Sequence, residues 1–245
     1  MTLGVAAPAI LFAAVSKAGF GSGADFAALA ILAIILPPQA ALGLMLPLLI
    51  LIDASAIRSY WGRWDPAALK VLLIGSVPGC AVGLWLLAVV DPEVVRFLIG
   101  ILCLAFVAFQ IARRSGRLRL SDWQPGPRIG LLSGFGAGFG SFISHAGGPL
   151  AAVYLLGRNT GKTTYQATTL GLFAIINLIK IGPYVAIGAV TRETLALGVW
   201  LVPMALLGTW LGVRAHYWMP ERPFFLLTYA LLLTAGSRLI WIGLG

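Results

Sequence analysis

Long apolar runs separated by short polar segments fill most of this 245-residue sequence. A membrane-spanning helix needs roughly 17–25 apolar residues. Runs close to or within this range cover residues 41–57, 67–90, 94–112, 165–183, 194–213 and 223–242. Shorter apolar pieces form two pairs, 3–15 with 24–36 and 129–143 with 150–156. We interpret each pair as a hairpin of short helices that meet at a glycine-rich break, either re-entrant or crossing the membrane obliquely. The pattern predicts an all-α integral membrane protein.

The chain also contains an internal repeat. SKAG at 16–19 recurs as SHAG at 144–147, and at the same spacing LGL at 42–44 recurs at 170–172. Later in each copy, the pattern P-x4-G-x-W at 78–85 recurs at 203–210. Motifs that recur in the same order indicate two homologous halves. We place these halves at 1–112 and 129–245, joined by a basic linker at 113–128. Each half is expected to contain one broken-helix hairpin and three transmembrane helices.

The distribution of basic residues favours an inverted relation between the halves. A hairpin returns the chain to its starting side, so each half would change sides an odd number of times. With that topology the basic loop residues concentrate on one side, and only Arg96, Arg192 and Arg238 fall on the other. Lysine and arginine concentrate on the cytoplasmic side of membrane proteins. We therefore expect two inverted-topology repeats, a cytoplasmic linker and both termini outside.

The composition agrees with a membrane protein and limits its partners. The chain is 60% hydrophobic and 10% charged, whereas soluble domains contain about 25% charged residues. The net charge of +9 lies mostly in loops, so it signals topology and not nucleic-acid binding. We expect the lipid bilayer and a small anion as partners, together with a coupling proton or cation. A homodimer is left open, and no nucleic acid, cofactor or metal is expected.

Ionisable residues within the apolar segments are the main candidates for function, because burying a charge in a bilayer is costly. They are Lys17, Asp53, His145 and Lys180, with the polar Asn177 nearby. Lys17 and His145 occupy equivalent positions in the repeat, and Asp53 and Lys180 almost do. In an inverted repeat, such positions tend to meet at the midplane, which predicts a common site.

Glycines beside Lys17 and His145 predict helix breaks at that site. A helix that begins at such a break presents free N–H groups and the positive end of its dipole, which favours anions. Two breaks with cationic side chains would form the cationic midplane pocket typical of secondary transporters. The predicted anion-binding residues are Ser16, Lys17, Gly19, Gly21, Gly23, Ser144, His145, Gly147, Gly148, Asn177 and Lys180.

Two residues are the candidates for coupling anion transport to a proton. Asp53 would restrain a lysine or carry a coupling proton. His145 is the more natural proton-linked group near neutral pH, because histidine titrates near pH 6.5. The glycines at 134, 136 and 138 are interpreted as close helix-packing positions.

Two other functional classes are weighed. An intramembrane hydrolase would use Ser141 or Ser144 with His145, but neighbouring residues do not place a serine oxygen on the ring, and no third group orients it. A cation carrier would use Asp53, although one carboxylate is outnumbered by two lysines and a histidine. Hard cations need several oxygen ligands. We therefore expect a transporter and not an enzyme.

Three stretches of the chain resemble a known family. They are SKAGFGSG, PPQAALGLMLPLLILIDASAIRSYWGRWD, and GSFISHAGGPLAAVYLL followed by ATTLGLFAIINLIKIGPYVAIGAVT. These stretches resemble the TauE/SafE sulfite exporter family, also called the toluene sulfonate uptake permease family, and the resemblance covers nearly the whole chain. It implies a multi-pass carrier of the bacterial inner membrane for sulfite, sulfonates such as sulfoacetate, or related organosulfur anions. It also implies that an ion gradient, and not ATP, drives transport.

Overall fold

The computed structural model describes residues 2–20, 25–116, 124–218 and 221–244, which form ten helices and no strand. The helices are α1 (Thr2–Phe20), α2 (Phe26–Ile35), α3 (Pro38–Tyr60), α4 (Pro66–Val89), α5 (Pro92–Arg114), α6 (Pro127–Ser144), α7 (Gly148–Gly157), α8 (Lys162–Ala186), α9 (Arg192–Trp218) and α10 (Glu221–Leu244). Of these, α1, α3, α4, α5, α8, α9 and α10 are long and apolar enough to cross a membrane. The predicted all-α, multi-pass membrane fold is confirmed.

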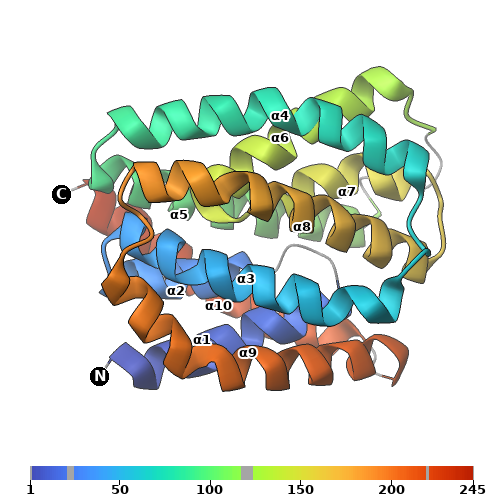
Figure 1. Cartoon of the computed structure of the whole chain (residues 1–245). Coiled ribbons are helices and arrows are strands. Elements are labelled where there is room, and N and C mark those ends of the chain that lie inside the picture. Colours follow the sequence, from blue (N-terminus) through green and yellow to red (C-terminus); the bar gives the residue numbers. More distant parts are fainter. Residues whose placement is uncertain (1, 21–24, 117–123, 219–220, 245) are drawn as a thin grey trace.

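The two hairpins enter the bundle from opposite ends. Figure 1 shows the long helices lying lengthwise, with both chain termini at one end, which we call the termini end. The opposite end, where α3 connects to α4 around Asp65, is called the Asp65 end. Helix α1 starts at the termini end and α2 returns the chain to it, because α3 begins there. Helix α7 returns to the Asp65 end, where Arg158 forms a salt bridge with Asp65 at 2.8 Å.

The helix contacts follow the order that a twofold relation would give. Helix α1 packs on α9, and its counterpart α6 packs on α4, which is the counterpart of α9. The central pairs, α3 with α8 and α5 with α10, join equivalent helices of the two halves. These contacts are compatible with the predicted inverted repeat. The inverted orientation and the division at 113–128 stay predictions.

Glycines allow the paired helices to approach closely. At the α4–α6 crossing, a Cβ added to Gly75, Gly79, Gly134 or Gly138 would lie 2.0–2.3 Å from a backbone oxygen of the facing helix. Such distances are far inside van der Waals contact, so only glycine fits without a backbone shift. The packing role predicted for Gly134 and Gly138 is confirmed, while Gly136 faces Leu150 of α7.

Gly79→Ala is expected to destabilise the protein by about 1–3 kcal/mol, because the new methyl group overpacks the α4–α6 crossing. The matched control is Gly182→Ala in α8, where nothing lies within 4 Å of an added Cβ. That change should be neutral or stabilising, since alanine favours helices over glycine. Thermal unfolding in detergent measures both. Equal melting temperatures for the two variants would contradict the close α4–α6 contact.

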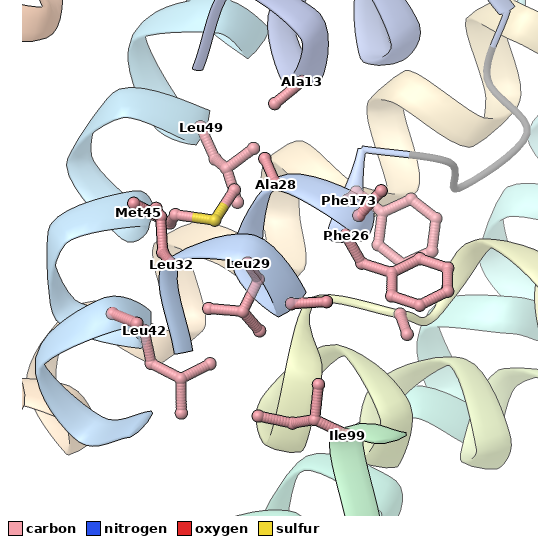
Figure 2. Close-up of a cluster of buried hydrophobic side chains, with 14 of the residues drawn as sticks. Ala13, Phe26, Ala28, Leu29, Leu32, Leu42, Met45, Leu49, Ile99 and Phe173 are labelled. Atoms are coloured by element: carbon pink, nitrogen blue, oxygen red, sulfur yellow. The ribbon is translucent and has the colours of Figure 1, made fainter. Parts of the chain in front are cut away.

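Helix α2 is apolar on all sides because it lies inside the bundle. Its sequence, FAALAILAII, places Phe26, Leu29 and Leu32 in the buried core. Figure 2 shows Leu42, Met45 and Leu49 of α3 on one side of α2 and Phe173 beside Phe26 on the other. A helix that is hydrophobic all round is expected in such a fully buried position. This packing fixes the direction in which the first hairpin returns.

The outer surface is apolar where a bilayer would cover it. Large exposed side chains include Trp85 on α4, Trp200 and Trp210 on α9, and Leu226 and Trp241 on α10. A soluble monomer rarely exposes so continuous an apolar surface. These faces are the lipid-contacting surface of a multi-pass membrane protein.

The Asp65 end gathers basic loop residues as the charge pattern predicted. Arg158 pairs with Asp65, and Lys162 donates to the His216 carbonyl oxygen at 3.0 Å. Asp65 also caps α4 by accepting from the N–H groups of Ala67 and Ala68. Burial would raise the pKa of Asp65, but the hydrogen bonds from Ala68 and Arg158 outweigh it and hold the pKa below its usual range. Asp65 therefore stays ionised and anchors both loops.

The first hairpin differs from the prediction in where its break lies. The expected piece 3–15 is part of a 19-residue helix, α1, about 28 Å long, that continues through the SKAG motif to Phe20. Helix α1 stays regular because Gly19 packs directly against the backbone of Gly212 in α9. In the second half, the SHAG motif is the break itself, since α6 ends at Ser144 and α7 begins at Gly148.

Candidate functional site

A buried cluster joins Lys17 of α1, Asp53 of α3 and Asn177 of α8. The Lys17 Nζ lies 2.9 Å from the Asp53 Oδ2 in a salt bridge. The Asn177 Nδ2 donates to the same oxygen at 2.8 Å. All three residues are buried, so their charges and dipoles compensate one another in place of water.

Four oxygens around this cluster have no hydrogen-bond partner among the described residues. They are the Asp53 Oδ1, the Gln166 Oε1 and the hydroxyl oxygens of Ser16 and Thr169. Buried polar atoms are normally hydrogen-bonded in native proteins. Such oxygens indicate a place where water, an ion or a substrate completes the bonding.

A second buried cluster joins Lys180 of α8 to the break between α6 and α7. Lys180 is 0% exposed. Its Nζ donates to the Ser141 carbonyl oxygen and lies 2.8 Å from the His145 Nδ1. A charged amino group can only donate, so Nδ1 accepts and the ring carries its proton on Nε2. The Nε2 faces the Leu42 carbonyl oxygen at 3.4 Å. His145 is neutral in this arrangement.

The backbone at His145 is left-handed. Its φ of 53° and ψ of 13° end α6 and turn the chain toward α7. The N–H groups of His145 and Ala146 donate to the carbonyl oxygens of Ser141 and Gly140. A left-handed conformation costs a residue with a side chain roughly 1–2 kcal/mol. The Lys180 and Leu42 contacts hold the ring in place despite this cost.

The two clusters occupy corresponding positions in the repeat. Lys17 and His145 are the variable residues of SKAG and SHAG, and each contacts a residue of the next long helix in its own half. Lys17 pairs with Asp53 of α3, and His145 with Lys180 of α8. The sequence predicts these four residues at a common site but leaves their pairing open, and the structure pairs Lys17 with Asp53 and His145 with Lys180.

A small cavity lies against both clusters. Its polar lining is Lys17, Asp25, Ser141, His145, Thr169 and Asn177, and the remaining lining is apolar apart from Gly148. Gly148 begins α7, so the free N–H groups and the positive dipole end of that helix reach the cavity wall. Both hairpins, α3 and α8 therefore contribute to one buried space.

The other predicted residues divide into several groups. Gly147 caps α7, and Gly19 lies inside α1, where its N–H belongs to the helix hydrogen-bond ladder. The sequence predicted that Gly19 would present a free N–H at a helix break. That prediction is wrong, because α1 continues to Phe20. Ser144 donates its hydroxyl to the Gly140 carbonyl oxygen. Gly21 and Gly23 lie outside the described residues.

Sequence reasoning missed three polar residues at the site. Asp25 and Thr169 line the cavity, and the Gln166 Nε2 donates to the carbonyl oxygens of Lys17 and Ala18. Asp25 follows the glycines of the first break, so its position was a usable signal. With Asp25 included, two aspartates accompany the two lysines, and the site has mixed charge where a cationic pocket was expected.

The geometry disfavours the two alternative functions. Both ring nitrogens of His145 face other groups, and the Ser144 hydroxyl bonds to a carbonyl, so the described residues lack the serine–histidine bond of a hydrolase. A cation at Asp53 would be repelled by the Lys17 ammonium, which already pairs with Oδ2. Across the described ranges, no group of three or more His, Cys, Asp or Glu side chains could hold a metal ion.

Comparison with known proteins identifies the family. A family model described as "Sulfite exporter TauE/SafE" matches residues 6–239, nearly the whole chain. Neither a comparison with curated proteins nor one with solved structures returned a match. The matched range includes both hairpins, both buried clusters and the residues that line the cavity. The chain therefore belongs to the TauE/SafE sulfite exporter family of membrane transport proteins.

Proposed function

We propose that this protein is a secondary transporter of the bacterial inner membrane for a small sulfur-containing anion. Sulfite, sulfoacetate and other sulfonates are the substrate class that the family suggests. The anion would occupy the cavity between the hairpins, and an ion gradient would drive its movement. The chain contains no phosphate-binding loop for ATP.

The observation that carries this proposal is the Lys180 amino group, which is fully buried against two residues of the cavity lining, Ser141 and His145, and has no carboxylate partner among the described residues. A buried ammonium is costly unless a negative charge offsets it. The His145 ring and a carbonyl oxygen contact it, and neither carries a full negative charge. An oxyanion in the cavity, near the α7 N-terminus, would give this ammonium a direct ionic partner, which Asp25 and Asp53 do not provide among the described residues.

The hairpins suggest how access could alternate. They enter from opposite ends of the bundle, and the cavity lies where they meet α3 and α8. Rocking of one half against the other about this position would expose the cavity to each side in turn. Glycines at the contacts between α1 and α9 and between α4 and α6 present no side chain that would interlock and oppose such movement.

Reconstituted protein tests the proposal. We expect uptake of labelled sulfite or sulfoacetate into liposomes that contain the wild-type chain, and loss of at least about 90% of that uptake in Lys180→Met. Lys70→Met is the matched control, because it removes a positive charge from an exposed residue of α4. Wild-type liposomes that move neither anion faster than empty liposomes would overturn the proposal.

Binding provides a second readout. Sulfite or sulfoacetate should raise the melting temperature of the wild type and of Lys70→Met, since a ligand stabilises the state that binds it. Lys180→Met should show no rise at the same concentrations. A rise that is equal in all three proteins would show binding elsewhere and contradict the assigned cavity.

A further inference from the structure

The charges around the cavity balance before any substrate is present. Lys17 and Lys180 contribute two formal positive charges, and Asp25 and Asp53 contribute two negative charges. His145 is neutral in its contact with Lys180. All five residues are buried, where an uncompensated charge is poorly tolerated. An anion that enters this site therefore adds net negative charge, and a positive charge that enters with it lowers the cost of burying that charge.

We infer that this additional charge is a proton bound by Asp53, so that the protein moves an anion and a proton together in the same direction. The inference rests on the proposed function and adds its coupling ion and the residue that carries it. Lys17 lines the cavity while it pairs with Asp53. When its ammonium turns to the anion, Asp53 loses its salt bridge, and a proton on the carboxylate removes the buried charge.

The hydrogen bonds of Asp53 leave room for that proton. Oδ2 accepts from both Lys17 and Asn177, whereas Oδ1 has no partner among the described residues. A proton on Oδ1 leaves the Asn177 bond to Oδ2 in place. The protonated residue can also donate from Oδ1, which a carboxylate cannot do. Asp53 can thus exist in both forms without rearranging α8.

The other titratable groups are less suited to this role. A proton on the His145 Nδ1 would place two cations 2.8 Å apart, because Lys180 already donates to that atom. Asp25 directly precedes α2 and forms no salt bridge with Lys17 among the described residues, so movement of that ammonium would not break an ion pair of Asp25. Asp53 is the sixteenth residue of α3 and lies away from both ends of that helix.

Few groups set the protonation of Asp53. It faces Lys17 from α1, Asp25 before α2, and Asn177 and Lys180 from α8. The neighbouring segments of α2, α5 and α9 contain no Asp, Glu, Lys, Arg or His at 26–36, 97–112 and 194–213. Further along α9, His216 bonds to the Gly19 carbonyl oxygen. Proton and anion binding are therefore linked chiefly through Lys17, and each strengthens the other.

Sulfoacetate transport in liposomes tests the inference, because both acid groups of this probe are ionised near neutral pH. The membrane potential is held at zero with valinomycin and equal potassium. An inward gradient of about one pH unit should then drive about tenfold accumulation by the wild type, as expected for one proton per anion. Asp53→Asn should not accumulate the probe but should exchange internal for external sulfoacetate. Asp65→Asn, at the Asp65 end, should accumulate it like the wild type.

Accumulation by Asp53→Asn equal to that of the wild type would overturn the inference and leave the proposed function standing. Wild-type accumulation that follows a sodium gradient and ignores the pH gradient would also overturn it. Wild-type liposomes that move neither sulfite nor sulfoacetate would overturn the proposed function and this inference with it.

If Asp53→Asn also loses exchange, proton uptake by the purified wild type tests the inference in its place. A pH-indicating dye in weakly buffered detergent should report about one proton taken up per sulfoacetate bound. Binding without proton uptake would overturn the inference. Asp65→Asn is again the control and should take up protons like the wild type.

Discussion

Lys17→Met is expected to lower the free energy of unfolding by about 3–5 kcal/mol, because it leaves one partner of a buried salt bridge without the other. Asp53 is 3% exposed, and Asn177 would remain its one hydrogen-bond donor among the described residues. Reversible unfolding in mixed detergent micelles measures the change. A cost below about 1 kcal/mol, as for exposed ion pairs, would show that water reaches the cluster.

The double variant Lys17→Met/Asp53→Asn separates charge from packing. It should recover most of the lost stability, since the neutral amide leaves no buried charge and its oxygen can still accept from Asn177. Anion uptake should be lost in Lys17→Met and in the double variant alike, because the cavity no longer contains the Lys17 ammonium. Lys70→Met controls for removal of a lysine. A double variant no more stable than Lys17→Met would show that the salt bridge is not the source of the cost.

The long helices could be predicted from the sequence because a bilayer restricts the backbone so strongly. A chain in hydrocarbon must satisfy its own N–H and C=O groups, which leaves helices as the solution for long apolar runs. All six such runs coincide with helices, from α3 to α10, although the run 67–90 extends one residue past the end of α4. The second hairpin was also predicted closely, since proline and two glycines at 147–149 combine a break with a helix start.

The end of α1 could not be predicted, because its glycine has a tertiary role. A glycine beside other glycines favours a break when only the sequence is considered. Gly19 lies within α1, and glycine is needed there because a Cβ would lie 2.5 Å from the Gly212 carbonyl oxygen of α9. Only the position of α9 distinguishes a packing glycine from a break glycine.

The residues of the site were easier to predict than their pairing. Charged residues in apolar segments stand out: Lys17 and His145 line the cavity, and they contact Asp53 and Lys180. The sequence allowed Asp53 to pair with several cations, and side-chain geometry decides among them. Asp25 was overlooked because it lies at the start of the short apolar piece 24–36, beside the break, where a carboxylate is ordinary.

The left-handed backbone of His145 makes this position sensitive to side-chain shape. His145→Val should destabilise the protein by about 2–5 kcal/mol, because a β-branched residue is strained at a φ of 53° and Lys180 loses an acceptor. His145→Gly loses the same acceptor but adopts this conformation without strain. The difference between the two variants therefore isolates the backbone contribution, which we expect to be about 1–3 kcal/mol.

His145→Asn is the informative third variant, because asparagine tolerates the left-handed region and offers an oxygen that can accept from Lys180. Its stability should lie closest to that of the wild type when all three variants are unfolded in detergent under the same conditions. Equal stability of the valine and glycine variants would show that the turn relaxes to another conformation. If the asparagine variant also retains anion uptake, His145 serves to hold the Lys180 ammonium in place, and the imidazole itself is not required for transport. That result would agree with a coupling proton on Asp53. If His145→Asn instead exchanges the anion but no longer accumulates it in response to a pH gradient, the coupling proton is assigned to His145.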